Sequence, residues 1–228
     1  MFNSMDAADA GVSKRERTRT LIADAAVASF RDRGYEDTTI RLLAGQLGIS
    51  TGNAYHHFPT KNHLVQELYL RVQEEHREAV VEPLRMTDDL IERLSVVYHR
   101  GLDTLEPFHK FAPGFLSAAM SPRSPINPLG PDSQPARDAA VAIFTDAVRG
   151  SRKGFAPDFD DQLPELLLLA YLLLALFWVY DTSPNQQRSH RLIDRGLALL
   201  KLSMPLVKLP LVRAPLRQFF DMVSEVRA

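Results

Sequence analysis

The amino-acid sequence predicts an all-α protein, and three observations lead to this fold class. Apolar residues recur at intervals of three and four along most of the 228 residues, which is the spacing of one face of an α-helix. No segment alternates apolar and polar residues in the manner of a half-buried strand. Gly and Pro residues divide the chain into segments of helix length, about ten in all.

Composition narrows the possible functions. Apolar residues make up 45% of the chain and charged residues 24%, a balance typical of globular domains rather than of disordered chains. The absence of cysteine excludes disulfides, thiolate metal sites and cysteine nucleophiles. With 27 Lys and Arg against 28 Asp and Glu, any surface that binds a polyanion must be local. Residues 14–63 carry a local excess, with eight basic side chains against five acidic ones.

The chain opens with a segment that is expected to form no helix. Residues 1–13 are mostly small or acidic without any period, which predicts a disordered tail. The opening MFNSMDAADAG also lacks the basic segment followed by an apolar one that directs secretion. We therefore expect a cytoplasmic protein.

Four helices are predicted in the N-terminal third of the chain. Gly34, Gly48, Pro59 and Pro83 end them, because glycine favours the residue after a helix and proline cannot continue one. Ser50 supplies a side-chain cap for the third of these helices. The predicted helices cover residues 14–33, 40–47, 51–58 and 61–82.

The remainder of the chain also follows a helical period. Thr87 opens a helix, and Pro113 is expected to kink or restart the aromatic-rich segment around it. Residues 121–135 contain five prolines and predict a long loop, which would either cover a pocket or be disordered. The predicted helices cover residues 87–105, 108–120, 136–149, 163–181, 186–204 and 211–227.

Fifteen consecutive apolar residues run from Leu166 to Tyr180. A membrane span needs about 20, and Glu165 and Asp181 bracket this run, so we predict a buried helix and no membrane partner. Peripheral membrane binding is the alternative. A helix that is apolar all round must be covered on every side, which one small domain cannot do. We therefore predict a homodimer whose interface contains Leu169, Leu173, Leu176, Leu192 and Leu199.

Residues Thr39 to Leu64 have the spacing of a helix-turn-helix, two short helices joined by a tight turn. Ala44 is small where the two helices must approach closely, and Gly48 suits the turn between them. Helices of about eight residues are not stable alone, so apolar contacts must hold them. Those contacts are expected from Ile40, Leu43, Leu47 and Ile49.

The outward side chains of the second short helix are polar, and none is acidic. Asn and Thr at a helix N-terminus can contact base edges in the major groove, while Tyr and His suit phosphate oxygens. Helix N-termini at Thr39 and Lys61 would also favour an anion. Spacing alone leaves open the alternative that these are short helices without DNA-binding activity. The outward residues are Thr51, Gly52, Asn53, Tyr55 and His56.

The segment from Arg17 to Leu64 closely resembles the N-terminal domain of TetR-family transcriptional regulators. The resemblance implies a homodimeric DNA-binding repressor, with a helix-turn-helix domain at residues 14–60 and a ligand-binding and dimerisation domain at 61–228. Its partners would be double-stranded palindromic operator DNA and a small, largely apolar or aromatic effector that releases the protein. The matching residues are Ile22, Ala25, Ala26, Phe30, Gly34, Tyr35, Thr38–Ile40, Leu43, Ala44, Leu47–Ser50, Gly52, Tyr55–Phe58, Lys61 and Leu64.

The same resemblance implies individual roles. Thr39, Tyr55, His56 and Lys61 match positions that contact phosphates, whereas Arg41, Thr51, Gly52 and Asn53 match positions that approach bases or nearby backbone. Two residues depart from the family's usual pattern. Asn53 stands where Thr is common, which would change the operator, and Ala54 stands where a larger apolar residue is usual, which would loosen the packing of the helix.

The effector site is predicted from an aromatic-rich set in the C-terminal part of the chain. An apolar cavity with a few polar groups is the usual ligand site, although the same residues could be ordinary core aromatics. The set comprises Tyr98, His99, Phe108, Phe111, Phe115, Phe144 and Trp178.

A helical enzyme, or an effector-binding protein without DNA-binding activity, is the alternative function. The sequence contains no His-Glu-x-x-His, no Gly-x-Ser-x-Gly and no glycine-rich phosphate loop. We therefore expect no catalytic residue, no metal site and no cofactor.

Overall fold

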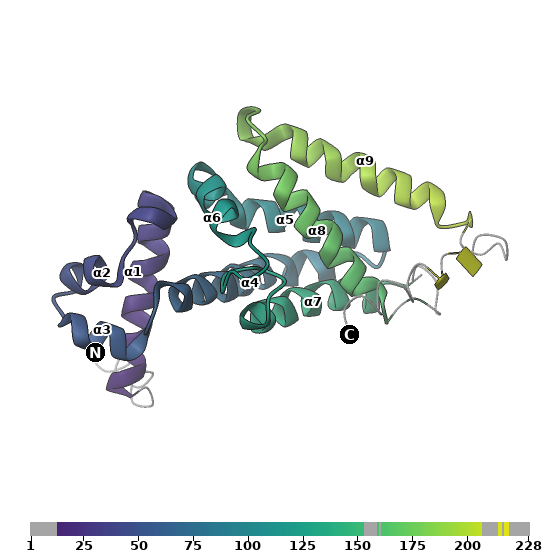
Figure 1. The fold of residues 1–228 in the computed structure, drawn as a ribbon. Helices are drawn as coiled ribbons and strands as arrows, with labels where there is room; N and C mark the ends of the chain where they lie inside the picture. The colour runs from purple at the N-terminus through teal and green to yellow at the C-terminus, as the bar shows by residue number, and fades with distance from the viewer. Residues whose placement is uncertain (1–12, 153–158, 160, 207–213, 216, 219–228) are drawn as a thin grey trace, which may run out of the picture. The chain divides into compact units, whose positions relative to one another are not determined.

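The computed structural model describes residues 13–152, 159, 161–206, 214–215 and 217–218. Within these ranges the chain forms nine α-helices and three short 3₁₀ helices without any strand, so the predicted all-α class is confirmed (Figure 1). Apart from Ser13, the tail predicted at 1–13 lies outside the described residues, as does most of the helix predicted at 211–227.

The chain forms two compact units. The first unit comprises residues 1–69 and 110–133, and the second comprises 70–109 and 134–228. The segment 110–133, which the sequence places with the C-terminal domain, is therefore part of the first unit. Helix α4 (Lys61–Arg85) belongs to both, because the division falls within it.

The first unit begins with α1 (Lys14–Asp37). Ser13 caps it reciprocally, since its hydroxyl accepts from the Glu16 N–H at 3.1 Å while the Glu16 carboxylate accepts from the Ser13 N–H at 2.8 Å. Gly34 has a φ of 84°, which breaks the helix as predicted, although one more helical turn follows it. A Cβ at Gly34 would lie 2.6 Å from the Phe111 ring, so this turn requires glycine for space as well as for conformation.

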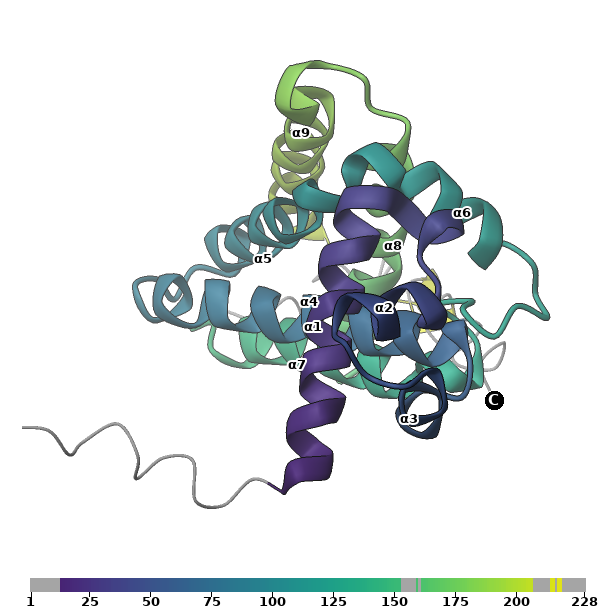
Figure 2. The ribbon, with the colours of Figure 1, turned by 90° about the vertical axis from the view of Figure 1, so that its left-hand side faces the viewer.

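Two short helices follow, α2 (Ile40–Gln46) and α3 (Thr51–His57), and they lie side by side next to α1 (Figure 2). The Thr39 hydroxyl accepts from the Leu42 N–H at 3.1 Å to cap α2. The Ser50 hydroxyl accepts from the Asn53 N–H at 3.2 Å to cap α3, as predicted. Between the two helices Gly48 adopts a φ of 64°, the left-handed conformation that the tight turn needs.

Helix α4 is longer than predicted, because it continues through Pro83 to Arg85. The expectation that Pro83 ends the helix was wrong. Proline removes one hydrogen-bond donor, but Val80 and Leu84 on either side of it are 2% and 7% exposed. Burial of these side chains therefore compensates for the lost bond in the last turn.

The proline-rich loop predicted at 121–135 packs within the first unit, which also contains α6 (Ala112–Ala119). The Gln66 side-chain amide donates to the Pro125 carbonyl at 2.7 Å, and the Tyr69 hydroxyl donates to the Ile126 carbonyl at 3.0 Å. Ile126 itself is 1% exposed. The loop is thus fastened to α4, and it ends in a 3₁₀ turn (Pro131–Ser133).

The second unit contains α5 (Leu90–Leu105), α7 (Gln134–Arg149), α8 (Leu163–Val179) and α9 (Gln187–Ser203). A 3₁₀ helix (Glu106–Phe111) follows α5, and another (Pro184–Gln186) precedes α9. Helix α5 begins three residues later than predicted, because the Asp89 carboxylate accepts from the N–H groups of Ile91 and Glu92 and so caps it there.

Two buried charged residues hold the helix ends of this unit. The Arg93 guanidinium donates to the carbonyls of Leu84, Thr87, Asp146 and Ala147, and so joins the ends of α4 and α7 to α5. Asp181 accepts four hydrogen bonds, from the backbone and hydroxyl groups of Ser183 and Ser189. Burial alone would raise the pKa of Asp181, but these bonds hold it well below its usual range.

Helix α8 is buried on one face only. Leu167, Leu168 and Trp178 face the core, whereas Leu173 is 68% exposed and Phe177 is 43% exposed. Helix α9 continues this uncovered apolar surface with Leu199, which is 68% exposed. Among the described helices, none combines the length and apolar character that a membrane span requires.

Candidate nucleic-acid interface

The helix-turn-helix predicted from spacing is held by a buried apolar cluster. Leu43, Ala44, Ala54 and Phe58 are each at most 1% exposed. Ala54 is the small residue at a position where the resemblance led us to expect a larger one. Its side chain is fully buried against the core. Of the four predicted apolar contacts, Ile40 and Leu43 are buried, while Leu47 and Ile49 are half-buried.

Most of the predicted DNA-contacting residues lie exposed around this cluster. Asn53 and Tyr55 on α3 point to solvent, and Tyr55 is 45% exposed. Nothing lies within 4 Å of a Cβ placed at Gly52, so a phosphate or base could approach the backbone there. The exposed residues are Thr39, Arg41, Gly52, Asn53, Tyr55 and His56, with Thr51 and Lys61 half-buried.

Lys61 has a structural role that the sequence did not predict. Its ammonium donates to the Glu36 carbonyl at 3.1 Å and lies 4.0 Å from the centre of the Tyr35 ring. Partial burial lowers the pKa of Lys61, against the opposing effect of the Glu36 and Asp37 carboxylates. Lys61 therefore ties the start of α4 to the last turn of α1, and its remaining N–H donors are available for a phosphate.

Arg19 is a second tie between helices. Its guanidinium donates to the His57 carbonyl at 3.3 Å, pairs with Glu67 at 2.8 Å and lies 4.5 Å from the centre of the Phe58 ring. It fixes α1 against the ends of α3 and α4, which sequence reasoning missed because it grouped Arg19 with the other basic residues of α1.

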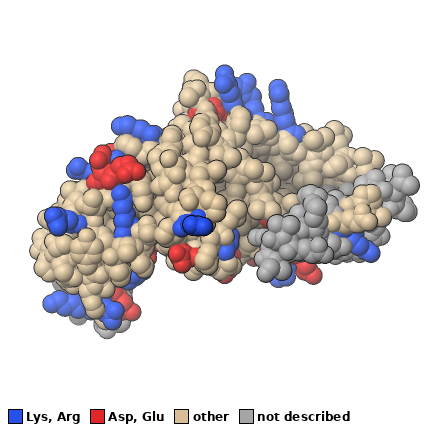
Figure 3. Space-filling model, viewed as in Figure 1, with Lys and Arg blue, Asp and Glu red and all other residues tan. Residues whose placement is uncertain are grey.

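The surroundings of His57 are electropositive. The pKa of His57 is lowered by partial burial first, then by the positive charges of His56, Arg15 and Arg19. Lys and Arg side chains gather where α1 begins (Figure 3). A positive potential beside an uncovered polar helix is the arrangement expected for a surface that contacts phosphates.

Comparison with known families decides what kind of protein this is. Residues 22–68 match the model of bacterial regulatory proteins of the tetR family. Residues 93–226, more than half of the chain, match the tetracyclin repressor-like C-terminal domain. The chain belongs to the TetR family. It is a transcriptional regulator of that family and not an enzyme.

Individual relatives agree with this assignment over part of their length. An HTH-type transcriptional regulator of Mycobacterium bovis is 37% identical over 57 residues, 25% of this chain and 27% of that protein. The HTH-type transcriptional repressor KstR2 of Rhodococcus jostii is 39% identical over 56 residues, 25% of this chain and 28% of that protein. The chain thus spans about a quarter of the length of the curated relatives it matches.

A solved structure extends the likeness in fold. The TetR transcriptional regulator from Nitrosomonas europaea superposes with a TM-score of 0.61 at 17% identity, covering 82% of this chain and 99% of that one. At this identity the comparison shows the fold alone. The TetR-like fold of this regulator therefore includes the C-terminal helices, where the sequence resemblance was weak.

The aromatic residues predicted to bind an effector are divided between the two units of this TetR-family chain. Tyr98 and Phe144 lie in the core of the second unit, with ring centres 5.4 Å apart. Trp178, also in the second unit, packs edge-on against His109 at 4.6 Å. Phe108 is buried in the 3₁₀ helix that follows α5.

The other predicted effector residues lie elsewhere. Phe115 belongs to the first unit and packs against Phe30, with ring centres 5.2 Å apart, and Phe111 fills the space beside Gly34. His99 lies near the surface of the second unit, where it hydrogen-bonds to His190 at 2.7 Å and to Asp194 at 3.0 Å. Phe111, Phe115 and His99 therefore have local packing or hydrogen-bonding roles.

Next to Tyr98 and Phe144 lies a polar cluster that sequence reasoning missed. His76, on α4, is 1% exposed, and Tyr171, on α8, is 4% exposed. Their ring centres are 5.8 Å apart, and the Tyr171 ring lies 6.1 Å from that of Phe144. The only sequence signal was a histidine at a position that the apolar period of the long helix assigns to its buried face.

The buried His76 should make stability depend on pH. Burial lowers the pKa of His76, although its hydrogen bond to the Val97 carbonyl opposes this. As the pH falls below about 6.5, the unfolded chain takes up a proton that folded His76 resists, so the free energy of unfolding decreases. We expect His76 to add up to about 1.4 kcal/mol per pH unit to this slope. Urea unfolding between pH 7.5 and 5.5 measures it, and an unchanged slope in His76→Gln would contradict the assignment.

Proposed function

We propose that this TetR-family regulator is a repressor that binds palindromic operator DNA as a homodimer and is released by a small, largely apolar or aromatic effector. The proposal rests on one observation, the exposed polar face of α3. The fully buried Ala54 on the opposite face packs α3 against the core, so the polar face stays turned to solvent. The relative KstR2 of Rhodococcus jostii is a transcriptional repressor, which supports repression rather than activation.

DNA recognition would take place at residues 14–60, with α3 in the major groove. Asn53 and Thr51, in the first turn of α3, would contact base edges, with Arg41 and Gly52 beside them. Phosphate contacts would come from Thr39, Tyr55, His56 and Lys61, which surround that turn. In this arrangement the N-terminus of α3 points its free N–H groups toward the DNA.

Dimerisation within residues 61–228 would bury the uncovered apolar surface of α8 and α9. Leu173 and Leu199 are each 68% exposed, Leu192 is 45% exposed and Leu176 is 37% exposed, while Leu169 is half-buried. An apolar surface of this extent on two neighbouring helices is typical of a subunit interface. A two-fold axis there would place two α3 helices in successive major grooves about 34 Å apart.

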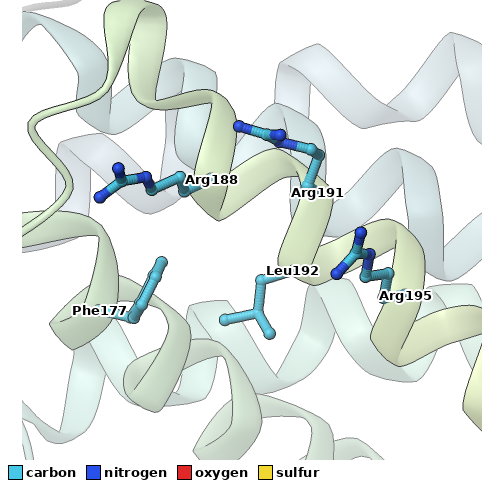
Figure 4. Close-up of a pocket in the computed structure, with 5 residues that line it drawn as sticks. All are labelled: Phe177, Arg188, Arg191, Leu192 and Arg195. Carbon is cyan, nitrogen blue, oxygen red and sulfur yellow. The ribbon is translucent and has the colours of Figure 1, made fainter.

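The surface between α8 and α9 also has a shape that suits a partner. A hollow of about 290 Å³ is lined by Phe177 on α8 and by Leu192 and three arginines on α9. Phe177 and Leu192 lie across the hollow from one another, with Arg188, Arg191 and Arg195 along one side (Figure 4). A side chain of the partner subunit would fill it.

Effector binding would act through α4. This helix runs from Lys61, beside the DNA-contacting residues, to Leu84 in the core of the second unit. A ligand changes DNA affinity only if it binds one arrangement of the dimer better than another. We propose that the effector shifts α4 and thereby changes the spacing of the two α3 helices. The test is operator affinity with and without the bound effector, and equal affinities would contradict the mechanism.

Replacing Asn53 with Ala should reduce operator affinity selectively. A side chain that contacts a base contributes about 1–3 kcal/mol of discrimination, so the operator should bind about 5-fold to 150-fold more weakly while random DNA binds as before. Gel shifts with DNA from upstream of the protein's own gene, against a scrambled duplex, measure both affinities.

Lys61→Ala provides the matched contrast. A lysine that contacts only phosphate should weaken operator and scrambled DNA alike and reduce the salt slope by about one unit per half-site. Because Lys61 also ties α4 to Tyr35, the free energy of unfolding of the Lys61→Ala variant must be measured together with its DNA affinity. Equal weakening of both DNAs by Asn53→Ala would show that Asn53 contacts only the backbone.

A further inference from the structure

Three buried polar atoms of the second unit have no hydrogen-bond partner within the part of the chain that the structure describes. They are Oε1 of Gln73, Nδ1 of His76 and the hydroxyl oxygen of Tyr171. An unpaired buried polar group costs about 1–3 kcal/mol, so three such groups in one unit would weaken the fold unless something else binds them. Gln73 and His76 are three residues apart on α4, which places them on neighbouring positions of one helix face.

The hydrogen-bond pattern determines what each atom can offer. His76 Nε2 lies 2.8 Å from the Val97 carbonyl, which can only accept, so Nε2 carries the proton. His76 Nδ1 is therefore an acceptor. Gln73 Oε1 is also an acceptor, and the Tyr171 hydroxyl can donate one hydrogen bond and accept another.

Two of the three groups, His76 and Tyr171, converge beside Gly101, on α5. A Cβ at residue 101 would lie 2.8 Å from the Tyr171 hydroxyl and 2.9 Å from Cε1 of His76, which is bonded to Nδ1. Glycine therefore allows α5 to approach both side chains. The rings of Tyr98 and Phe144 lie 6.3 and 6.1 Å from that of Tyr171, so aromatic surface adjoins the polar atoms.

We propose that Gln73, His76 and Tyr171 form the polar end of the effector site and bind a neutral hydroxyl group carried by an apolar or aromatic ligand. A hydroxyl donates to one of the acceptors, His76 Nδ1 or Gln73 Oε1, and accepts from Tyr171. The rings of Tyr98 and Phe144 contact the apolar part of the ligand. Gln73 is half-buried, and so it forms the outer edge of the site through which the ligand enters.

The donor pattern excludes carboxylate ligands. An ionised carboxylate can only accept, so it would leave both acceptors unpaired and place its charge among buried aromatic rings. The site therefore selects a phenol or alcohol over an acid of the same size.

This inference rests on the proposed effector function and specifies its ligand. Gln73 and His76 lie about three and four turns after Lys61 on α4, so a ligand bound to them acts directly on the helix that is proposed to move. Binding is measured on the full chain without DNA, so failure of the site and failure of operator regulation are separate results.

The experiment compares three single-ring probes, phenol, toluene and benzoate, by isothermal titration calorimetry on the full-length protein. We expect saturable phenol binding at millimolar concentration or below, at least 10-fold tighter than toluene or benzoate. Tyr171→Phe should abolish the preference for phenol over toluene without lowering the melting temperature, because the hydroxyl it removes has no partner among the described residues.

Tyr69→Phe is the matched control. Tyr69 lies in the first unit and its hydroxyl donates to the Ile126 carbonyl at 3.0 Å, so its loss should lower the melting temperature and leave the phenol preference intact. Gly101→Ala, which inserts a methyl group among the polar atoms, should abolish phenol binding as a second variant. The proposal is overturned if phenol binds no better than toluene, or if Tyr171→Phe retains the preference.

Discussion

Replacing Leu173 with Lys is expected to separate the proposed dimer into monomers. Leu173 is 68% exposed in the isolated chain, near the centre of the uncovered apolar surface of α8. A two-fold interface contains each residue twice, so the change removes two buried leucines at about 2 kcal/mol each. The total of about 4 kcal/mol corresponds to a roughly thousandfold increase in the dimer dissociation constant. Sedimentation velocity over a concentration series measures this change.

Operator binding should fall together with dimerisation, because a monomer contacts one half-site only. Leu129→Lys is the matched control, since Leu129 is 58% exposed in the proline-rich loop of the first unit, whereas α8 and α9 belong to the second. This variant should dimerise and bind DNA like the unchanged protein. A Leu173→Lys protein that sediments as a stable dimer would place the interface elsewhere.

Replacing Arg93 with Met should destabilise the second unit by about 3–5 kcal/mol. Methionine fills a similar apolar volume but donates no hydrogen bonds, so the carbonyls of Leu84, Thr87, Asp146 and Ala147 lose their partner. Hydrogen bonds from a charged donor contribute about 1.5–3 kcal/mol each, and their effects are not additive. Chemical denaturation measures the free energy of unfolding.

Arg100→Met is the control. It tests whether replacing any arginine on α5 by methionine destabilises the protein as much as replacing Arg93 does. Arg100 is exposed and pairs with Asp103 at 3.3 Å on the same helix, an arrangement that contributes less than about 1 kcal/mol. Similar losses from both substitutions would mean that the buried hydrogen bonds of Arg93 contribute little. We expect Arg93→Met to be several times more costly.

The N-terminal part of the fold was predictable because its signals are local. Gly34, Gly48 and Ser50 each act on the backbone within a few residues, so their identity predicts a break, a turn and a cap. The exposed face of α3 also followed from sequence, since its polar residues lie on one side of a short helix whose apolar residue, Ala54, must be buried.

Helix ends that depend on distant contacts were less predictable. Pro83 lies inside α4, although proline usually ends a helix, because Val80 and Leu84 are held by the core. Helix α5 begins at Leu90 rather than at Thr87. Thr87, Asp88 and Asp89 are all polar residues that could cap the helix, and Asp89 is the one that does. In both cases the deciding interaction involves side chains whose surroundings the sequence does not specify.

Sequence by itself determined the all-α class, the helix-turn-helix and the set of side chains that α3 presents, because these depend on periodicity and on contacts between near neighbours. Only the tertiary structure decided that Lys61 and Arg19 tie helices together, that Phe111 and Phe115 pack in the first unit, and that His76 and Tyr171 meet beside Gly101. These contacts join residues that are far apart in the sequence. Their geometry is set by how whole helices pack, which no local pattern encodes.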